Sequence, residues 1–529
     1  MIAVSRPAAP PAVQMAQAAL LAVMLSIWAA AVVVTFFVGQ RLHALPLIAA
    51  TVFPVVLYAS KNPRLFMLFG AVGTAFIGLS INFERRVHVG GAPSFSIELV
   101  DLFLIPLVVF MIRDRARGLA KGFQLSPVSL WWAGLIVLGV GNLILGPFRL
   151  FAGYEVFRML KCWLLFLVIV NECVREKHFQ HAVVALAAGV ALNLLIAAAQ
   201  YAVKGSLGLQ ALGEASADAV LGANLGVYLQ GDVYRVSGLV GHPNLFGAYL
   251  AMLLPIFAAL VFTDYPARLK LAFVALTIAG MTGLVLTLSR TGWSAYAAAM
   301  LCLVLFLYLH PALRNRWTRR KGLMVVGLAL VALAASGPVI RRLTASDSGA
   351  LDFRYELLGV AWNMIKAKPI LGVGLNSFSY HIEYAPYGVA KMVELFGPVW
   401  PVVHNTFFLV WAEQGSIGLL LFLGLNLHLL WIAWRNTRFG LSSRITMLNV
   451  ALFGAVVALL VDGFGSFYLR VPGPARVFWV IAGLIVASHY WNVRNLAARS
   501  APIPPGPAGA IPRNGPPYST APQEPTCRS

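Results

Sequence analysis

Arg235, Arg290 and His404 are the side chains of this chain whose chemistry suits a phosphate-linked substrate. A guanidinium stays charged and donates two parallel hydrogen bonds, the geometry that a pyrophosphate accepts. An imidazole exchanges a proton near neutral pH, as general acid–base catalysis requires. Each of the three residues stands where a polar stretch meets an apolar run. The pattern predicts anion binding and acid–base chemistry at the ends of apolar segments.

His404 closes the longest polar loop and is followed at once by an apolar run. Asn405 or Thr406 is suited to cap a helix that starts there. The alternative to a catalytic role is a histidine that only packs at the start of this helix. Glu413 lies nine residues further along, about two and a half helical turns, so it leaves the helix on a different face and cannot form a zinc pair with the histidine. Gly415 belongs to a small-residue pattern that predicts close contact with another helix.

The composition places these segments in a membrane. Of the 529 residues, 60% are hydrophobic and 11% are charged, and the mean hydropathy is +0.80, which implies more apolar surface than a soluble domain can bury. Apolar runs long enough to cross ~30 Å of hydrocarbon recur along the chain. We predict an all-α polytopic membrane protein with about 12–14 transmembrane helices. The runs lie near 16–38, 44–59, 65–82, 97–112, 128–145, 158–172, 181–203, 240–262, 270–288, 292–310, 322–340, 404–434, 446–466 and 474–490.

The distribution of basic residues predicts the orientation, because short loops rich in Lys and Arg stay in the cytoplasm. Alternate loops, starting at 60–64, hold eighteen Lys and Arg residues, whereas the opposite short loops hold eight. Both termini are therefore expected in the cytoplasm, and the long 341–403 loop is expected outside. The net charge of +21 follows from this bias and from attraction to anionic lipid, so it does not indicate nucleic-acid binding.

The two arginines stand beside apolar runs on the predicted outer side. Arg235 leads through turn-permitting glycines into a run that begins near Pro243, where Asn244 offers an amide. Arg290 lies in a turn so short that it joins two runs almost back to back. A serine or asparagine could also form the polar break between the two runs, at a lower free-energy cost than a guanidinium, whose insertion costs ~2.5–3.5 kcal/mol at membrane depth. Arg290 is therefore the better functional candidate, although either arginine could simply anchor the chain to lipid phosphates.

The 341–403 loop contains a predicted amphipathic helix. Between Leu351 and Lys368, apolar residues recur at helical spacing and polar residues fall on the other side. This helix is expected to lie on the membrane surface or against the bundle, and Pro369 ends it. Arg354, near the start of the helix, can contact an anionic substrate or pair with a neighbouring carboxylate. The glycine-bearing turn after Pro369 lacks the strand and helix of a nucleotide-binding loop.

The remaining sequence outlines the domains. Residues 1–15 and 491–529 are predicted to be disordered cytoplasmic tails, the second rich in proline, and 16–490 to be the transmembrane domain. The four cysteines show no metal-ligand spacing, so they predict neither a disulfide framework nor a zinc site. No internal repeat is visible, which disfavours a transporter built from inverted halves.

Four motifs of the chain resemble those of the bacterial O-antigen ligase and O-antigen polymerase superfamily. They lie on one predicted side of the membrane and cover residues 225–425. Elsewhere the resemblance is one of general character, and the tails are longer and richer in proline than expected of a ligase. The motifs are Arg235…Gly238…His242-Pro243-Asn244, Ser289-Arg290, Arg354…Trp362…Lys368-Pro369…Gly372-Val373-Gly374…Phe378, and His404-Asn405…Glu413…Gly415…Gly418.

The resemblance implies a role for each candidate residue. Members of this superfamily transfer glycans from undecaprenyl pyrophosphate to an acceptor hydroxyl at the periplasmic face of the inner membrane, without a nucleotide sugar, a metal or another cofactor. By this resemblance, Arg235 and Arg290 bind the donor pyrophosphate, and His404 accepts the proton of the acceptor hydroxyl or orients that hydroxyl. The 341–403 loop would form the glycan or acceptor cleft. Further substrate contacts are expected from Arg354, Asn244 and Asn405.

Several functions stay open on the sequence. A ligase would join the glycan to lipid A–core, and a polymerase would join it to another lipid-linked repeat of O antigen or exopolysaccharide. Transfer to a protein is a third option. From a different class, a flippase or exporter of lipid-linked sugar would need the basic residues but not His404. A structural subunit of an envelope complex would need none of them.

Overall fold

The protein is built almost entirely of helices in the computed structural model, which describes residues 62–86, 90–120, 122–214, 228–229, 233–315, 318–323, 327, 337, 350–384, 387 and 402–500. The predicted all-α polytopic membrane fold is confirmed in this part of the chain. Two short antiparallel hairpins accompany the helices, β1 (Ser80–Phe83) with β2 (Phe95–Glu98) and β3 (Tyr228–Leu229) with β4 (Val233–Tyr234). The principal helices are α3 (Pro63–Gly73), α4 (Leu99–Ala116), α5 (Val128–Leu145), α6 (Arg149–Glu172), α7 (Glu176–Val203), α9 (Pro243–Leu260), α10 (Ala267–Leu286), α11 (Arg290–Leu309), α13 (Ala350–Ala367), α14 (Phe378–Tyr384), α16 (Thr406–Thr437), α17 (Ser443–Asp462) and α18 (Pro472–Ser500).

Most of the predicted apolar runs coincide with these helices. Seven helices within the described residues are long and apolar enough to cross a membrane, namely α5, α7, α9, α10, α11, α16 and α17. The runs at 16–38 and 44–59, and nearly all of the run at 322–340, lie outside the described residues. The last helix, α18, continues to Ser500, ten residues beyond the end of its predicted run.

The run at 65–82 was predicted to be one spanning helix, and this prediction is wrong in extent. Its helix, α3, has 11 residues and ends at Gly73, too short for the ~20 residues that a membrane crossing needs. Beyond this point the backbone N–H of Gly78 bonds to the carbonyl oxygen of Leu212 at 2.9 Å, and β1 begins at Ser80. The backbone groups of the apolar run are thus satisfied by a distant segment rather than by more helix.

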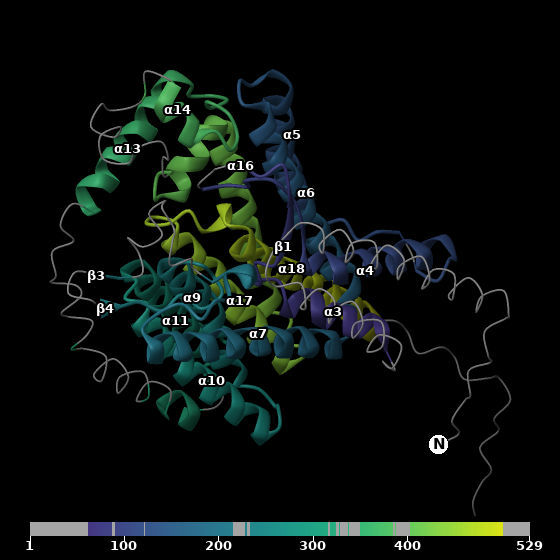
Figure 1. The fold of residues 1–529 in the computed structure, drawn as a ribbon. Coiled ribbons are helices and arrows are strands. Elements are labelled where there is room, and N and C mark those ends of the chain that lie inside the picture. Colours follow the sequence, from purple (N-terminus) through teal and green to yellow (C-terminus); the bar gives the residue numbers. More distant parts are fainter. Residues whose placement is uncertain are drawn as a thin grey trace, which may run out of the picture.

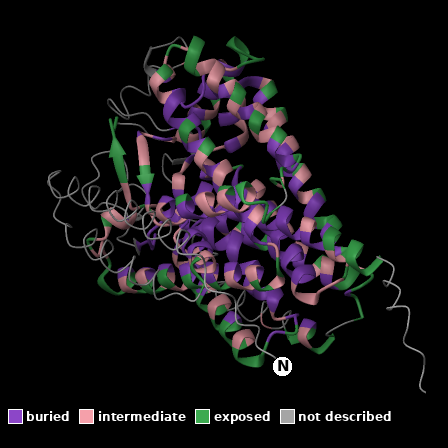
Figure 2. Ribbon diagram, turned by 90° about the vertical axis from the view of Figure 1, so that its right-hand side faces the viewer, coloured by how far each residue is buried: buried purple, intermediate pink, exposed green. Residues whose placement is uncertain are grey.

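Helix α9 forms the centre of the bundle. It carries no charged residue, and it packs against α10, α11 and α17. Its first residue is Pro243, and the ring of His242 caps it by accepting a hydrogen bond from the backbone N–H of Asn244 at 3.1 Å. Figure 1 shows α9, α11 and α17 side by side, and Figure 2 shows buried residues concentrated in the middle of the molecule. A wholly apolar helix is stable in such an interior.

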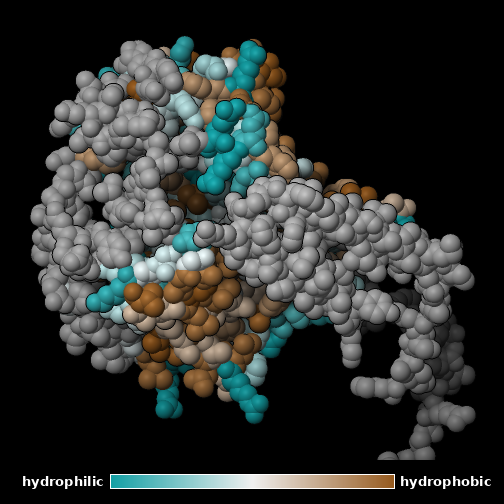
Figure 3. Space-filling model, in the orientation of Figure 1, coloured by the Kyte–Doolittle hydropathy of each residue, from teal (hydrophilic) through white to brown (hydrophobic). Residues whose placement is uncertain are grey.

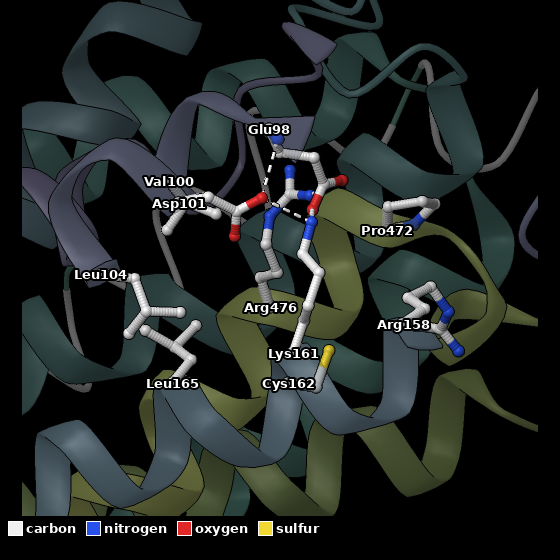
Figure 4. Close-up of a pocket in the computed structure, with 10 residues that line it drawn as sticks. All are labelled: Glu98, Val100, Asp101, Leu104, Arg158, Lys161, Cys162, Leu165, Pro472 and Arg476. Carbon is white, nitrogen blue, oxygen red and sulfur yellow. Dashed lines mark hydrogen bonds and ion pairs between the residues drawn. The ribbon is translucent and has the colours of Figure 1, made fainter. Parts of the chain in front are cut away.

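Helix α6 has a different environment, because it carries charges into the protein interior. Lys161 pairs with Glu98 at 2.8 Å and with Asp101 at 2.6 Å, and Arg476 of α18 pairs with the same Glu98. Figure 4 shows these charged side chains converging at the edge of a cavity, with Arg158 apart from them. The cavity volume is about 10 Å³, enough for one water molecule at most. This cluster therefore holds α4, α6 and α18 together and is too small to bind a substrate.

Successive helices run in opposite directions, so their connections gather at two ends of the bundle. The end that carries the described residues 74–86, 90–98, 204–214, 233–242, 287–289, 368–384, 402–405 and 463–471 is here named the site end. At the opposite end, Arg444 pairs with Asp264 at 3.0 Å, and the Tyr490 hydroxyl donates to the carbonyl oxygen of Leu125 at 3.1 Å. Figure 3 shows a hydrophobic band over the part of the molecule where Figure 1 places α9 to α11, with hydrophilic side chains above and below it.

The predicted amphipathic helix is confirmed as α13. The helix runs from Ala350 to Ala367, and Pro369 follows its end. Its apolar face packs against the segment from Val402 to Ala412, so that the helix lies against the bundle. The apolar side chains on this face are buried, except that Phe353 is half-buried: Phe353, Leu357, Val360, Ala361, Met364 and Ile365.

Candidate active site

Arg235 is held rigidly at the site end of α9. Its side chain is 4% exposed, so it does not extend into solvent or lipid. The Nε atom donates to the carbonyl oxygen of Thr287 at 2.7 Å, and Nη2 donates to Oδ1 of Asn244 at 2.5 Å. These bonds join the segment before α9 to the end of α10. A guanidinium fixed in this way needs no rearrangement to stabilise a nearby negative charge.

Arg290 is the first residue of α11, on the same side of the bundle. Ser289 caps the helix by accepting a hydrogen bond from the backbone N–H of Gly292 at 3.2 Å. A methyl group added at Gly247 would lie 2.9 Å from Cβ of Ser289, so the first turns of α9 and α11 touch backbone to backbone. This contact brings the Arg290 turn beside the segment that contains Arg235 and Asn244, and the Arg290 side chain is half-buried there.

His404 lies just before α16 in an aromatic setting. Its ring makes edge contacts with Phe467 and Phe353, at centroid distances of 5.2 and 6.4 Å. The Nδ1 atom is buried and has no hydrogen bond of normal geometry among the described residues, and the backbone of Val402 lies beside the ring. The predicted cap is confirmed, since Asn405 Oδ1 accepts a hydrogen bond from the backbone N–H of Phe408 at 3.0 Å. The amide of Asn405 also donates to the carbonyl oxygen of Phe464 at 3.3 Å.

The electrostatics link four of these side chains across three segments. Burial, and then the positive charge of Arg354 on α13, lower the pKa of His404 to about 4. Burial lowers the pKa of His242 to about 3, with further contributions from the charges of Arg235, His404 and Arg354. Both imidazoles are therefore neutral at pH 7, beside two guanidinium groups. A neutral imidazole can accept a proton, and the arginines supply the positive charge that an anion requires.

Asp462, which the sequence analysis did not select, lies at the same place. It is the last residue of α17 and 1% exposed, and neither carboxylate oxygen has a hydrogen bond of normal geometry within the described residues. The hydroxyl groups of Thr291 and Ser466 lie beside this carboxyl group, and the charge of Arg354 acts on it. An acidic residue that ends an apolar run was the available signal, because an ionisable side chain at the end of a membrane helix is costly unless it has a function.

The turn that follows Asp462 is hydrogen-bonded to Thr406, two residues after His404. The backbone N–H of Thr406 donates to the carbonyl oxygen of Gly463 at 2.7 Å, and the Thr406 hydroxyl donates to that of Ser466 at 2.7 Å. On the other side, a methyl group at Gly465 would lie 2.4 Å from Cγ2 of Thr291, the residue after Arg290. The turn after α17 therefore fills the space between the starts of α11 and α16.

Comparison with known families gives a match over part of the chain. The family model described as O-antigen ligase matches residues 271–423, a stretch that contains Arg290, Arg354 and His404. This match supports the resemblance of the chain to the O-antigen ligase and polymerase superfamily. Arg235, Asn244 and Asp462 lie outside the matched stretch and join the candidate site through the contacts described above. No curated protein matches the chain.

The glycine motif of this O-antigen ligase-like protein has a structural explanation. Helix α16 is interrupted at Gly415, where φ is +66° and ψ is −171°. The segment 369–374 lies in this break: the N–H groups of Val373 and Gly374 donate to the carbonyl oxygens of Ala412 and Glu413, at 2.9 and 3.0 Å. In return, the N–H of Ser416 donates to the carbonyl oxygen of Pro369 at 2.8 Å. The predicted contact of Gly415 with another helix is therefore wrong, because its partner is this loop segment.

Glu413 anchors the next part of the loop to α16. Its carboxylate accepts hydrogen bonds from the backbone N–H groups of Asn376, Ser377 and Phe378, at 3.0, 3.1 and 3.1 Å, where α14 begins. Arg470 pairs with this carboxylate and also with Glu155 of α6 at 3.0 Å. All the contacts of the Glu413 carboxylate hold α14 to the bundle, so Glu413 has a positioning role. Among the described residues, no group of His, Cys, Asp and Glu side chains is arranged to hold a metal ion.

Alanine at Gly372 or Gly415 is expected to destabilise the protein by on the order of 2–5 kcal/mol, from backbone strain and overpacking together. Both glycines have positive φ, and a methyl group would lie 2.3 Å from the carbonyl carbon of Glu413 or 2.1 Å from the carbonyl oxygen of Ile370. Thermal unfolding of the purified protein in detergent measures the change. Gly359→Ala is the matched control, because a methyl group on this exposed face of α13 meets nothing within 4 Å. Equal stability of all three variants would contradict the assigned packing.

Proposed function

We propose that this protein is an inner-membrane glycosyltransferase that moves a glycan from undecaprenyl pyrophosphate to an acceptor hydroxyl at the periplasmic face. The observation that supports it most is the convergence of Arg235, Arg354 and His404 with the carboxylate of Asp462 at one end of the bundle. Positive charge for an anionic leaving group and a neutral base are the two requirements of this transfer. The family match to an O-antigen ligase supports the same reaction class.

In the proposed reaction, the acceptor oxygen attacks the anomeric carbon of the donor glycan. The bond between that carbon and the phosphate oxygen breaks, and its electron pair leaves with the pyrophosphate. Arg235 and Arg290 stabilise the negative charge that grows on this leaving group. His404, neutral at pH 7 because of its low pKa, takes the proton of the acceptor hydroxyl. The products are the glycosylated acceptor and undecaprenyl pyrophosphate.

The positions of the remaining candidates suggest supporting roles. Arg354 lies on α13, in the loop proposed to line the glycan or acceptor cleft, and its charge reaches both His404 and Asp462. Asn244 orients Arg235, and Asn405 caps α16 directly after His404. Both asparagines therefore position site residues in the described structure, and contacts to substrate would be additional.

Transfer of a labelled undecaprenyl-pyrophosphate glycan by membranes that contain the protein tests the proposal. A product on lipid A–core identifies a ligase, and lengthened lipid-linked chains identify a polymerase of O antigen or exopolysaccharide. Movement of labelled donor across the membrane without a new glycosidic bond would instead identify a flippase or exporter. In that case a neutral polar replacement of His404 should be tolerated, since transport needs the basic residues but no base.

Asp462→Asn is expected to lower kcat/KM for the acceptor by about 10- to 100-fold, the value of one hydrogen bond to a charged group. The proposed reason is that the carboxylate accepts a hydrogen bond from the acceptor hydroxyl and orients it toward the donor. Donor binding should stay unchanged, because the carboxylate does not contact the pyrophosphate. The substitution keeps the side-chain shape, so thermal stability serves as the folding control. Loss of donor affinity with unchanged acceptor kinetics would refute this role.

A further inference from the structure

The outward face of α16 at the opposite end carries a group of aromatic and basic side chains far from the candidate site. Residues spaced three and four apart lie on one face of a helix. The residues between them face the bundle and are buried: Ile432, Ala433, Asn436 and Thr437. The residues of the outward face are Trp431, Trp434, Arg435 and Arg438, and here they are named the Trp–Arg face.

The Trp–Arg face and Phe439 line a cleft of about 460 Å³. This volume is within the range of ~300–1,000 Å³ that small-molecule sites occupy. The side chains of Trp431 and Trp434 are 47% and 37% exposed, on a helix long and apolar enough to cross a membrane. Because α16 ends at Thr437, the cleft lies at the level of the lipid head groups, where tryptophan is enriched.

Each guanidinium in the cleft lies over an indole ring. The Cζ atom of Arg438 lies 3.8 Å from the ring centroid of Trp434, and that of Arg435 lies 5.2 Å from the centroid of Trp431. Stacking uses the flat face of a guanidinium and leaves the N–H groups at its edge directed outward. Those edges are the geometry that binds two phosphate oxygens at once.

Among the described residues, no acidic side chain balances the positive charge of the cleft. No carboxylate lines the cleft, and in the described part of the chain neither Arg435 nor Arg438 forms an ion pair. The charge of Arg438 also reaches His310 at the end of α11, where it adds to burial in lowering the pKa of that imidazole. A head group with its own ammonium would be repelled by two such charges, whereas a head group with net negative charge would be attracted.

We propose that the Trp–Arg face binds the phosphate head group of an anionic phospholipid in the leaflet opposite the candidate site. The guanidinium edges of Arg435 and Arg438 bind the phosphate oxygens, and the two indole rings pack against the glycerol and the first acyl carbons. The ligand chemistry is a phosphodiester, and the aromatic walls select the membrane lipid over a free phosphate ion. This site does not depend on the proposed transfer reaction.

The test is binding of phosphatidylglycerol to the purified full chain in detergent, measured by native mass spectrometry and by thermal shift. The double variant Arg435→Gln, Arg438→Gln is expected to lose about 10- to 100-fold in affinity for this lipid. The matched control is Arg268→Gln with Lys270→Gln, which removes the same charge from an exposed and a half-buried residue at the same end outside the cleft and should bind as the parent does. The double Lys variant keeps the charge and should lose only part of the affinity.

Three outcomes would overturn the proposal. Equal binding of phosphatidylglycerol and phosphatidylcholine would remove the selectivity for net negative charge. If inorganic phosphate raises the unfolding temperature as much as phosphatidylglycerol does, the cleft binds a free anion and not a lipid. If the control and the Gln variant lose the same affinity for phosphatidylglycerol, the loss comes from the lower net charge of the protein and not from the cleft. If the Gln variant does not fold, Trp434→Ala replaces it, because this change removes the stacking partner of Arg438 and keeps both charges.

Discussion

Replacing His404 by alanine is expected to lower turnover by roughly 10²–10⁴-fold, the usual contribution of a positioned acid–base group. Binding of the undecaprenyl-pyrophosphate donor should stay nearly unchanged, because the imidazole acts on the acceptor proton and not on the pyrophosphate. Transfer of labelled glycan by the purified variant, beside equilibrium binding of the same donor, separates the two effects. The control is His181→Ala, at a half-buried histidine near the start of α7 at the opposite end, and this variant should keep full activity.

The pH dependence adds a second readout for the same residue. Since the pKa of His404 is lowered to about 4, the neutral base predominates above this pH, and kcat/KM should fall only as the pH drops through about 4 rather than through about 6.5. The same shift makes the free energy of unfolding depend on pH. The unfolded chain binds the proton near pH 6.5, whereas folded His404 binds it only near pH 4. The protein should therefore lose stability as the pH falls from about 6.5 to about 4. A His404→Ala enzyme with wild-type activity would contradict the proposed mechanism and favour an exporter.

Arg290→Ala is expected to fail differently, with donor affinity and rate falling together. The guanidinium would contact the pyrophosphate in both the ground state and the transition state, so kcat/KM should fall by roughly 10²–10³-fold. Arg290→Lys should rescue only in part, because an ammonium keeps the charge and loses the planar fork. Initial rates over a range of donor concentrations, with direct donor binding, measure both changes.

Arg149 provides the matched control for this prediction. Like Arg290, it is the first residue of a helix at the site end, but it is exposed and belongs to α6. Arg149→Ala should therefore leave donor affinity unchanged. If Arg149→Ala and Arg290→Ala weaken donor binding equally, the arginine at the start of α11 contributes only general positive charge. Unchanged binding in Arg290→Ala would remove this residue from the pyrophosphate site altogether.

The sequence alone was sufficient for the features that depend on neighbouring residues. The apolar runs predicted most of the helices, because burial in a bilayer needs about 20 consecutive apolar residues whatever the rest of the chain does. The starts of α9 and α16 follow from Pro243, which suits a first helical turn, and from Asn405, whose capping bond reaches only three residues ahead. The periodicity of α13 likewise predicted its buried face correctly.

Tertiary contacts changed the interpretation of other local patterns. The apolar run at 65–82 looked like one span, but its second half bonds to the segment near Leu212 and leads into a hairpin. Gly415 looked like a surface for a neighbouring helix, but its missing side chain admits the backbone of Ile370. In both cases the composition is compatible with a helix, and the structure differs because the contacting segment is distant in the sequence: Leu212 is 134 residues from Gly78, and Ile370 is 45 residues from Gly415.

The sequence by itself determined that this is a membrane protein, where α9 and α16 begin, and that Arg290 and His404 stand at helix starts, with Arg235 in the segment that leads into α9. Only the tertiary structure brought Asp462 beside Arg354, held Arg235 between Thr287 and Asn244, and lowered the pKa of His404. The physical reason is the range of the forces. Hydrophobic run length and helix capping act within a few turns of one chain segment, whereas desolvation and charge pairing depend on which distant segments exclude water together.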